Sequence, residues 1–166
     1  MFRNPITCTI AEFLTMIGIE VIPSRLQGEC FLPGIRVDEG RLLVDEQTLE
    51  YPGDLLHEAG HLALVPAMVR ASLSGEVNVP GEDMDAMEVK ATAWAYAAIN
   101  HLGLDPAILF HQGGYKGKSE GLLFTYQAGV YLGAFGLEQA GMTATGKLAR
   151  ELNVAPYPSM LKWLKD

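Results

Sequence analysis

The sequence predicts an α+β fold in which a small antiparallel sheet packs on a mainly helical domain, with one short helix at its centre. Short extended segments are confined to the first third of the chain, whereas capped helical segments punctuated by glycine fill the rest. Hydrophobic residues make up 49% of the 166 residues and charged residues only 19%, which is enough apolar side chain for a buried core. We therefore expect a single domain that spans residues 1–166.

The N-terminal third should contain one helix and all of the strands. Thr9 and Glu12 form a capping box, apolar residues follow them, and Gly18 should end this helix. The Asp-Glu-Gly sequence at residues 38–40 predicts a turn between two extended segments. The extended segments cover residues 19–22, 29–32, 35–37 and 41–45, which together predict the small antiparallel sheet.

Cap residues and prolines define the remaining helices. Glu50, Pro52 and Asp54 favour the start of the central helix, and Pro66 should end or kink it. Of five further helices, four follow an Asp or Ser that can cap a helix, and Asn153 closes the other. These helices are expected at residues 84–101, 106–111, 120–135, 146–152 and 160–165.

The segment from Gly121 to Leu137 is the most hydrophobic part of the chain. It is only seventeen residues long, contains the polar residues 125–127, and has no basic residue directly after its C-terminal end. We therefore expect a buried helix that packs closely through Gly129 and Gly133, and not a membrane span.

The charges and the cysteines favour a cytoplasmic protein that binds neither nucleic acid nor membrane. The formal net charge is −8, and none of the 12 basic residues forms a run that could neutralise phosphates. Residues 6–19 are mostly apolar, but Glu12 interrupts them and Arg3 alone gives a positive start, so they do not resemble a signal peptide. Cys8 and Cys30 are isolated, and we expect free thiols in a reducing compartment.

The central helix contains two histidines four residues apart with a glutamate between them, His57-Glu58-x-x-His61. On a helix, residues i and i+4 share a face, so both imidazoles can reach one Zn²⁺ at about 2.0–2.1 Å. Glu58 is rotated by about 100° from His57 and flanks the same edge, where it could hold the water of the metal. The apolar residues on both sides should bury the rest of the helix and give the ligands a rigid base.

A third ligand should come from the acidic residues downstream. Catalytic zinc usually has three protein ligands and one water, and the candidates are Glu82, Asp83, Asp85 and Glu88. Glu88 is placed best, because its helix carries small residues that could pack closely against the histidine helix. Those small residues are Ala91, Thr92 and Ala95. Without the histidine motif, Glu88 has a simpler interpretation. It would be an acidic residue in the first turn of a helix that Asp83 caps, where the helix dipole favours a negative charge.

Together these segments resemble the ImmA/IrrE family of small bacterial and phage zinc peptidases. The resemblance covers roughly residues 30–100 and does not extend to 104–166; it rests on the extended segment 41–45, the histidine motif, and Glu88-x-x-Ala91 followed by Trp94-Ala95. It implies a zincin-like domain in which His57, His61 and Glu88 bind zinc and Glu58 is the catalytic base. The chain departs from the family after this point, because the Leu-Met-Pro-like turn that often ends the second helix is absent.

These residues favour a zinc-dependent peptidase. Zinc would polarise the scissile carbonyl and lower the pKa of its water to about 7, while Glu58 takes the proton of the water and passes it to the leaving amine. The substrate would be a protein or peptide, and the resemblance implies a regulatory protein such as a repressor. One alternative is a metal-containing regulatory or protein-binding module without peptidase activity, and another is an interaction domain without metal in which His57 and His61 point apart.

Two polar segments that contain glycine, residues 71–82 and 111–118, could border the substrate cleft. Metallopeptidases commonly stabilise the oxyanion with a histidine or tyrosine. The sequence offers His101, His111, Tyr115 and Tyr126 for this role. The two histidines lie near expected helix C-termini, where an imidazole ordinarily interacts with the last carbonyl groups.

Overall fold

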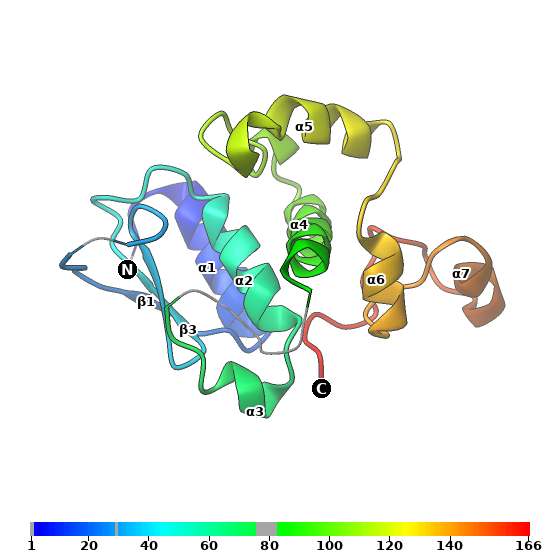
Figure 1. The fold of residues 1–166 in the computed structure, drawn as a ribbon, viewed down its shortest axis with the longest axis horizontal. Helices are drawn as coiled ribbons and strands as arrows, with labels where there is room; N and C mark the ends of the chain where they lie inside the picture. The colour runs from blue at the N-terminus through cyan, green and yellow to red at the C-terminus, as the bar shows by residue number, and fades with distance from the viewer. Residues whose placement is uncertain (1, 29, 76–82) are drawn as a thin grey trace.

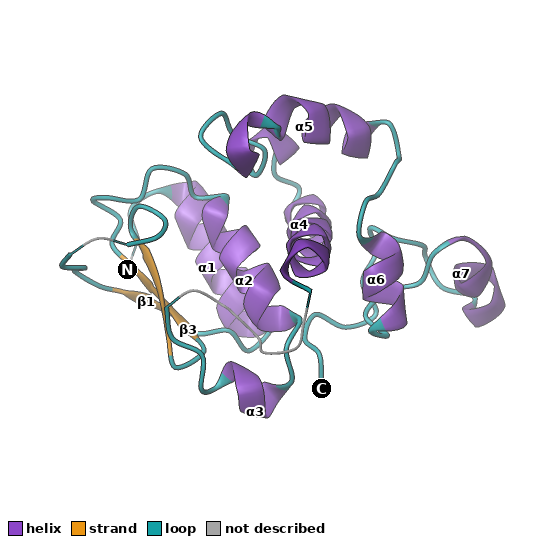
Figure 2. Cartoon of the chain, in the orientation of Figure 1, coloured by secondary structure: helices purple, strands orange, loops and turns teal. Residues whose placement is uncertain are grey.

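The computed structural model describes residues 2–28, 30–75 and 83–166 and has the predicted α+β fold. In the view of Figure 1, α4 runs through the middle of the molecule, with α1, α2 and the sheet on its left and α5, α6 and α7 above it and to its right. Figure 2 shows that the strands are confined to one side and that helices make up the rest of the regular structure. The helices and strands are α1 (Pro5–Met16), β1 (Val21–Pro23), β2 (Ile35–Asp38), β3 (Arg41–Val44), α2 (Asp54–Ala63), α3 (Ala67–Arg70), α4 (Met84–His101), α5 (Ser119–Gln127), α6 (Ala134–Gln139) and α7 (Gly146–Leu152), with the 3₁₀ turns η1 (Pro106–Ile108) and η2 (Tyr115–Gly117).

Helix α1 begins earlier than the capping box predicted. The Asn4 side chain accepts hydrogen bonds from two backbone N–H groups of the first turn, and Pro5 occupies the first helical position. Thr9 therefore lies inside the helix, where its hydroxyl donates to the carbonyl of Pro5. The predicted end is confirmed, because Gly18 follows the helix with a φ of +101°.

The sheet has the strand order β1-β3-β2. Strands β2 and β3 form an antiparallel hairpin, but β1 pairs with β3 in parallel, so the sheet is mixed and the antiparallel prediction is wrong for β1. Strand β3 lies between β1 and β2 in the sheet. Strand β1 follows α1 in the chain and runs in the same direction as β3. The strand predicted at 29–32 is not formed by its described residues, of which Leu32 makes only an isolated bridge to Ile35.

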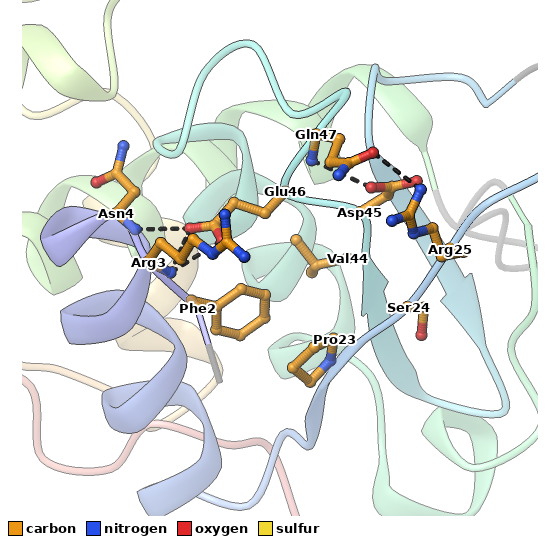
Figure 3. Close-up of a pocket in the computed structure, with 10 residues that line it drawn as sticks. All are labelled: Phe2, Arg3, Asn4, Pro23, Ser24, Arg25, Val44, Asp45, Glu46 and Gln47. Atoms are coloured by element: carbon orange, nitrogen blue, oxygen red, sulfur yellow. Dashed lines mark hydrogen bonds between the residues drawn. The ribbon is translucent and has the colours of Figure 1, made fainter.

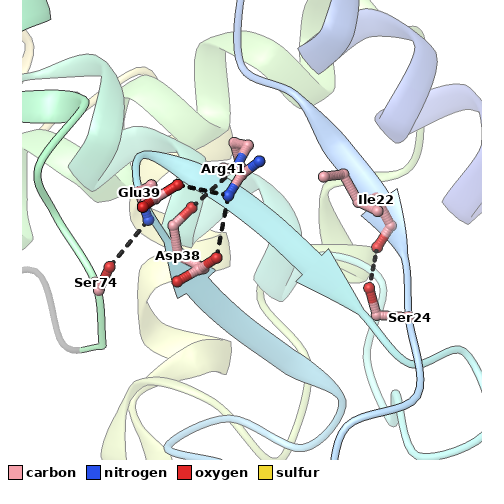
Figure 4. Close-up of polar contacts among 6 residues, drawn as sticks. All are labelled: Ile22, Ser24, Asp38, Glu39, Arg41 and Ser74. Carbon is pink, nitrogen blue, oxygen red and sulfur yellow. Dashed lines mark hydrogen bonds and ion pairs between the residues drawn. The ribbon is translucent and has the colours of Figure 1, made fainter.

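The turn between β2 and β3 is held by charged side chains and by the segment after α3 (Figure 4). Arg41 pairs with the carboxylates of Asp38 and Glu39 at 3.2 and 2.9 Å. The backbone N–H of Glu39 donates to the hydroxyl of Ser74 at 2.9 Å. Glu39 and Gly40 have φ values of +48° and +74°, so the predicted turn is confirmed.

Helices α2 and α4 pack directly against each other at the centre of the domain. Helix α4 has the predicted bounds, and the side chain of Asp83 caps its first turn. Gly60 allows the two helices to approach, because a Cβ atom there would lie only 2.8 Å from the carbonyl oxygen of Ala91. The fully buried apolar residues of α2 are Leu55, Leu56, Ala59, Leu62 and Ala63. As predicted, α2 ends before Pro66, which separates it from α3.

The predicted helix at 120–135 is instead two helices, α5 and α6. Gly129 and Gly133 lie between them with φ values of +79° and +85°, which an α-helix does not accommodate. Gly133 does pack closely, because a Cβ atom there would lie 2.3 Å from the carbonyl oxygen of Val89 on α4. Helix α5 is not buried as expected, since Phe124 is 74% exposed.

The remaining C-terminal predictions have mixed outcomes. The predicted helix at 106–111 is only the single turn η1, whereas α7 has its predicted bounds and Asn153 ends it with a φ of +54°. Residues 160–165 form no helix. Long-range contacts hold this segment in place, including a 2.9 Å hydrogen bond from the Trp94 indole N–H to the carbonyl of Trp163.

Two further features concern the thiols and the membrane. Cys8 and Cys30 are free, as predicted. In the part of the chain that the structure describes, every helix is too short or too polar to cross a bilayer.

Candidate metal centre

His57, His61 and Glu88 meet where α2 faces α4. The two histidines lie one turn apart on α2, and their Nε2 atoms are 3.1 Å apart. The carboxylate of Glu88 on α4 spans both rings, with Oε2 at 3.3 Å from Nε2 of His57 and Oε1 at 3.2 Å from Nε2 of His61. The structure thus brings the three predicted ligands together, and the two histidines do not point apart as expected for an interaction domain without metal.

The spacing of these donor atoms suits a metal ion. In a tetrahedral zinc site, bonds of about 2.0–2.1 Å place neighbouring donor atoms about 3.3 Å apart. The two Nε2 atoms are 3.1 Å apart, and each has its own carboxylate oxygen of Glu88 at 3.2 or 3.3 Å. One donor atom from each of the three residues lies within 4.8 Å of the other two. Two imidazole nitrogens and a carboxylate are a donor set that suits Zn²⁺ better than Mg²⁺ or Ca²⁺. The three residues could therefore hold one such ion.

Helix packing sets this spacing. Gly60 lies one residue before His61 on α2 and contacts the backbone of Ala91, which lies one turn after Glu88 on α4. The two helices therefore meet within about one turn of the ligands that each of them carries. The hydroxyl of Thr92 donates to the carbonyl of Glu88 at 2.9 Å, so its polar atom is satisfied within α4. Small residues on α4 therefore do what the sequence predicted, and bring Glu88 within reach of both histidines.

The charges of the cluster are coupled. Hydrogen bonds from His57 and His61 hold the pKa of Glu88 well below its ordinary range. Burial acts to lower the pKa of His57, but the hydrogen bond to Glu88 and the neighbouring carboxylates outweigh burial, so the pKa of His57 is raised. Both shifts favour the charged forms, so protons compete with a metal ion for this cluster.

Glu58 has a different environment from Glu88. It is buried, with 9% of its surface exposed, and burial raises the pKa of its carboxyl although His61 and His57 act in the opposite direction. It also lines a groove of about 260 Å³ between α2 and the region of β2. The other residues that line this groove are Cys30, Phe31, Leu32, Ile35, Arg36, Val37 and Gly75.

The two other candidate ligands that the structure describes, Asp83 and Asp85, do not join the cluster. Asp83 uses its side chain to cap α4, where it accepts hydrogen bonds from the backbone N–H groups of Asp85 and Ala86. Asp85 is exposed in the first turn of α4. Glu82 lies outside the described residues, as does the second half of the segment 71–82 that was expected to border the cleft.

Of the four candidates for oxyanion stabilisation, Tyr115 alone contacts one of the three ligand residues within the described structure. Its hydroxyl lies 3.5 Å from Nδ1 of His57, and the two rings meet edge to face at 5.4 Å. Tyr126 instead donates to the carbonyl of Leu132. His101 ends α4 as expected and packs against aromatic rings, including that of Phe13.

The sequence suggested that His111 interacts with the last carbonyl groups of a helix, but the structure gives it a different partner. Its Nε2 donates to Oδ1 of Asp54 at 2.7 Å, because the segment after η1 returns to the start of α2. Tyr51 stacks on the His111 ring, with centroids 3.7 Å apart and an angle of 8° between the planes. The sequence indicates Asp54 only as a helix start and indicates no role for Tyr51; the one signal it carries is that Asp54 lies one turn before His57.

A larger hollow of about 440 Å³ lies elsewhere, between the start of α1 and the ends of β1 and β3 (Figure 3). Its acidic groups already have partners, because Glu46 accepts from the backbone of Arg3 and Asn4 while Asp45 accepts from the backbone of Gln47. None of the predicted site residues lines it.

No protein-family model, curated protein or solved structure matches this chain.

Proposed function

We propose that this protein is a zinc-dependent peptidase that hydrolyses a peptide bond of a protein or peptide. The observation that carries the proposal is the convergence of His57, His61 and Glu88 at 3.1–3.3 Å beside a second, buried carboxylate that lines a groove. Three protein ligands leave one position for water in a tetrahedral site, which is the arrangement of catalytic zinc.

His57, His61 and Glu88 would hold the ion. Bound zinc supplies a Lewis acid and lowers the pKa of a water molecule. Glu58 would accept a proton from the attacking water and return it to the leaving amine. Its raised pKa suits this exchange, because a general base works best when its pKa lies close to the working pH.

The groove beside Glu58 would receive part of a peptide substrate. It runs past residues of β2, and Leu32, Ile35 and Val37 give it apolar walls that could receive side chains of a peptide. The resemblance to the ImmA/IrrE peptidases favours a regulatory protein, such as a repressor, as the substrate.

Two measurements test the proposal. Tag-free protein should contain one zinc per chain, and a peptide library should be cleaved in a reaction that a chelator abolishes and added zinc restores. Glu58→Gln should retain zinc and lose orders of magnitude in rate, whereas Glu12→Gln, the same change on the exposed side of α1, should retain both. Full activity of Glu58→Gln would refute the mechanism. Zinc without cleavage of any peptide would favour the metal-containing binding module instead.

A further inference from the structure

Tyr115 has a backbone conformation that a tyrosine rarely adopts. Tyr115 and Lys116 have φ values of +53° and +52°, in the left-handed region where only glycine, asparagine and aspartate are common. Non-glycine residues in this region cost free energy and persist only where other contacts hold them. Here the conformation directs the phenol ring toward His57, where its hydroxyl lies 3.5 Å from Nδ1.

If Nε2 of His57 binds a metal, Nδ1 of the same ring has a proton to donate in a hydrogen bond. A neutral imidazole carries one proton, so coordination through Nε2 places that proton on Nδ1. Tyr115 Oη is the acceptor, and burial raises its pKa so far that the phenol keeps its own proton. Thr92 interacts with the same phenol and donates to the carbonyl of Glu88 at 2.9 Å. In this arrangement Nδ1 of His57 donates to the Tyr115 hydroxyl, and the Tyr115 hydroxyl can donate to Thr92. The Thr92 hydroxyl in turn donates to the backbone of Glu88, a second ligand residue.

His61 differs from His57 in this respect. Its Nδ1 is buried and has no hydrogen-bond partner among the residues that the structure describes. His61 is only 4% exposed, whereas the ring of His57 has the additional contact with Tyr115.

A second set of contacts holds Tyr115 in place. The hydrogen bond between His111 and Asp54, with both side chains nearly buried, ties the segment 111–118 to the first turn of α2. Tyr51 covers the His111 ring, and Gly113 is required there because a Cβ atom would lie 2.6 Å from the Tyr51 ring. The anchor lies one turn before His57 on the same helix.

We propose that Tyr115 is a positioning residue that orients the imidazole of His57 for metal binding through Nε2, held there by the His111–Asp54 pair. The inference rests on the metal site of the proposed function. It differs from a role in oxyanion stabilisation, because the hydroxyl faces Nδ1 and not the side of the ring on which Nε2 meets Glu88 and His61.

The test measures zinc affinity by competition with a chromophoric chelator, with Co²⁺ absorption as a readout of ligand geometry. Tyr115→Phe should weaken zinc binding by about 10–100-fold, the usual effect of losing a partner behind a metal ligand, and should shift the Co²⁺ bands. Tyr157→Phe is the matched control, because it also removes a buried hydroxyl hydrogen bond to α4, from Tyr157 to the carbonyl of Ala93 at 2.8 Å. It should bind zinc like the wild type.

Further variants keep the test decisive if Tyr115→Phe folds poorly. Thr92→Val removes the onward acceptor without changing the shape of the side chain, and His111→Phe keeps the stack on Tyr51 but removes the bond to Asp54. Both should weaken zinc binding in the same direction. Unchanged affinity in all three variants would overturn the inference while leaving the proposed function intact. A wild type that binds no zinc would overturn both. Unchanged affinity with a lower kcat at saturating zinc would assign Tyr115 to the oxyanion instead.

Discussion

Gly60→Ala should disturb the metal site and the fold together, although it adds only one methyl group. The new Cβ atom would lie 2.8 Å from the carbonyl oxygen, 3.2 Å from Cα and 3.3 Å from the carbonyl carbon of Ala91. All three neighbours are backbone atoms of α4, so no side chain can rotate away. Helices α2 and α4 must instead move apart by about half an ångström to restore ordinary contact distances.

This movement has two opposing effects on stability. Overpacking of a dense core costs about 1–3 kcal/mol, whereas alanine gains about 1 kcal/mol over glycine inside a helix. The net free energy of unfolding should therefore fall by about 0–2 kcal/mol. Zinc affinity should fall more clearly, by about tenfold or more, because metal sites tolerate deviations of only about 0.2 Å in ligand distance.

Gly121→Ala is the matched control. Gly121 lies in α5, and nothing lies within 4 Å of a Cβ atom placed there, so this variant gains helix propensity without overpacking. The two variants should differ by about 1–3 kcal/mol, or about 2–12 °C in melting temperature for a chain of this size. Calorimetry and chelator competition provide the two readouts. Equal melting temperatures and wild-type zinc affinity in Gly60→Ala would refute the argument that backbone contact at Gly60 sets the ligand spacing.

Three further predictions follow from burial and charge. Glu58→Gln should raise the melting temperature of the metal-free protein at neutral pH. Burial raises the pKa of Glu58 in the folded protein above its unfolded value, so the wild type loses stability as the pH rises from the unfolded pKa to the folded pKa. Glu58→Gln does not have this loss. The difference in stability between the variant and the wild type should disappear below about pH 4, where Glu58 is protonated in both the folded and the unfolded state. As the pH falls, zinc affinity should drop by about tenfold per pH unit once His57 is protonated, starting at a higher pH than for a free imidazole. Glu88→Gln removes a ligand and should weaken binding at every pH, but it should also move this onset to lower pH because Glu88 contributes most to raising the pKa of His57. Chelation should leave the helical circular dichroism intact, since the core of α2 and α4 is buried without the ligands, and zinc at about 100 times its Kd should add about 2.7 kcal/mol to the stability.

The parts of the fold that short-range signals determine were predictable. Asp83 at the start of α4 and Asn153 after α7 gave the correct bounds, because capping acts within one turn of the helix. The start of α1 was missed because Asn4 caps it from an earlier position and is itself held by Glu46, far along the chain. The break between α5 and α6 was missed because Gly133 is required by contact with α4, which periodicity does not reveal.

The same distinction applies to the candidate site. The i, i+4 spacing of His57 and His61 and the small residues after Glu88 were sufficient to expect three ligands at one point. The role of Asp54 was not predictable, because its partner His111 is 57 residues away in the chain. Tyr115 could be named only as one of four candidates, since the left-handed backbone that directs it toward His57 has no signature in a tyrosine-lysine sequence.

The two parts of the site, the α2–α4 helix pair and the turn that carries Tyr115, should also differ in how easily they open. The α2–α4 pair is held by a continuous buried core, so separating His57 from Glu88 requires disruption of that core. The turn that carries Tyr115 is held by the nearly buried hydrogen bond from His111 to Asp54 and by the stack of His111 on Tyr51, and it stores the strain of two left-handed residues. Local opening should therefore release the ring of His57 before it changes the ligand spacing. Metal exchange would then be governed by the turn at 111–118, whereas ligand spacing is governed by helix packing at Gly60.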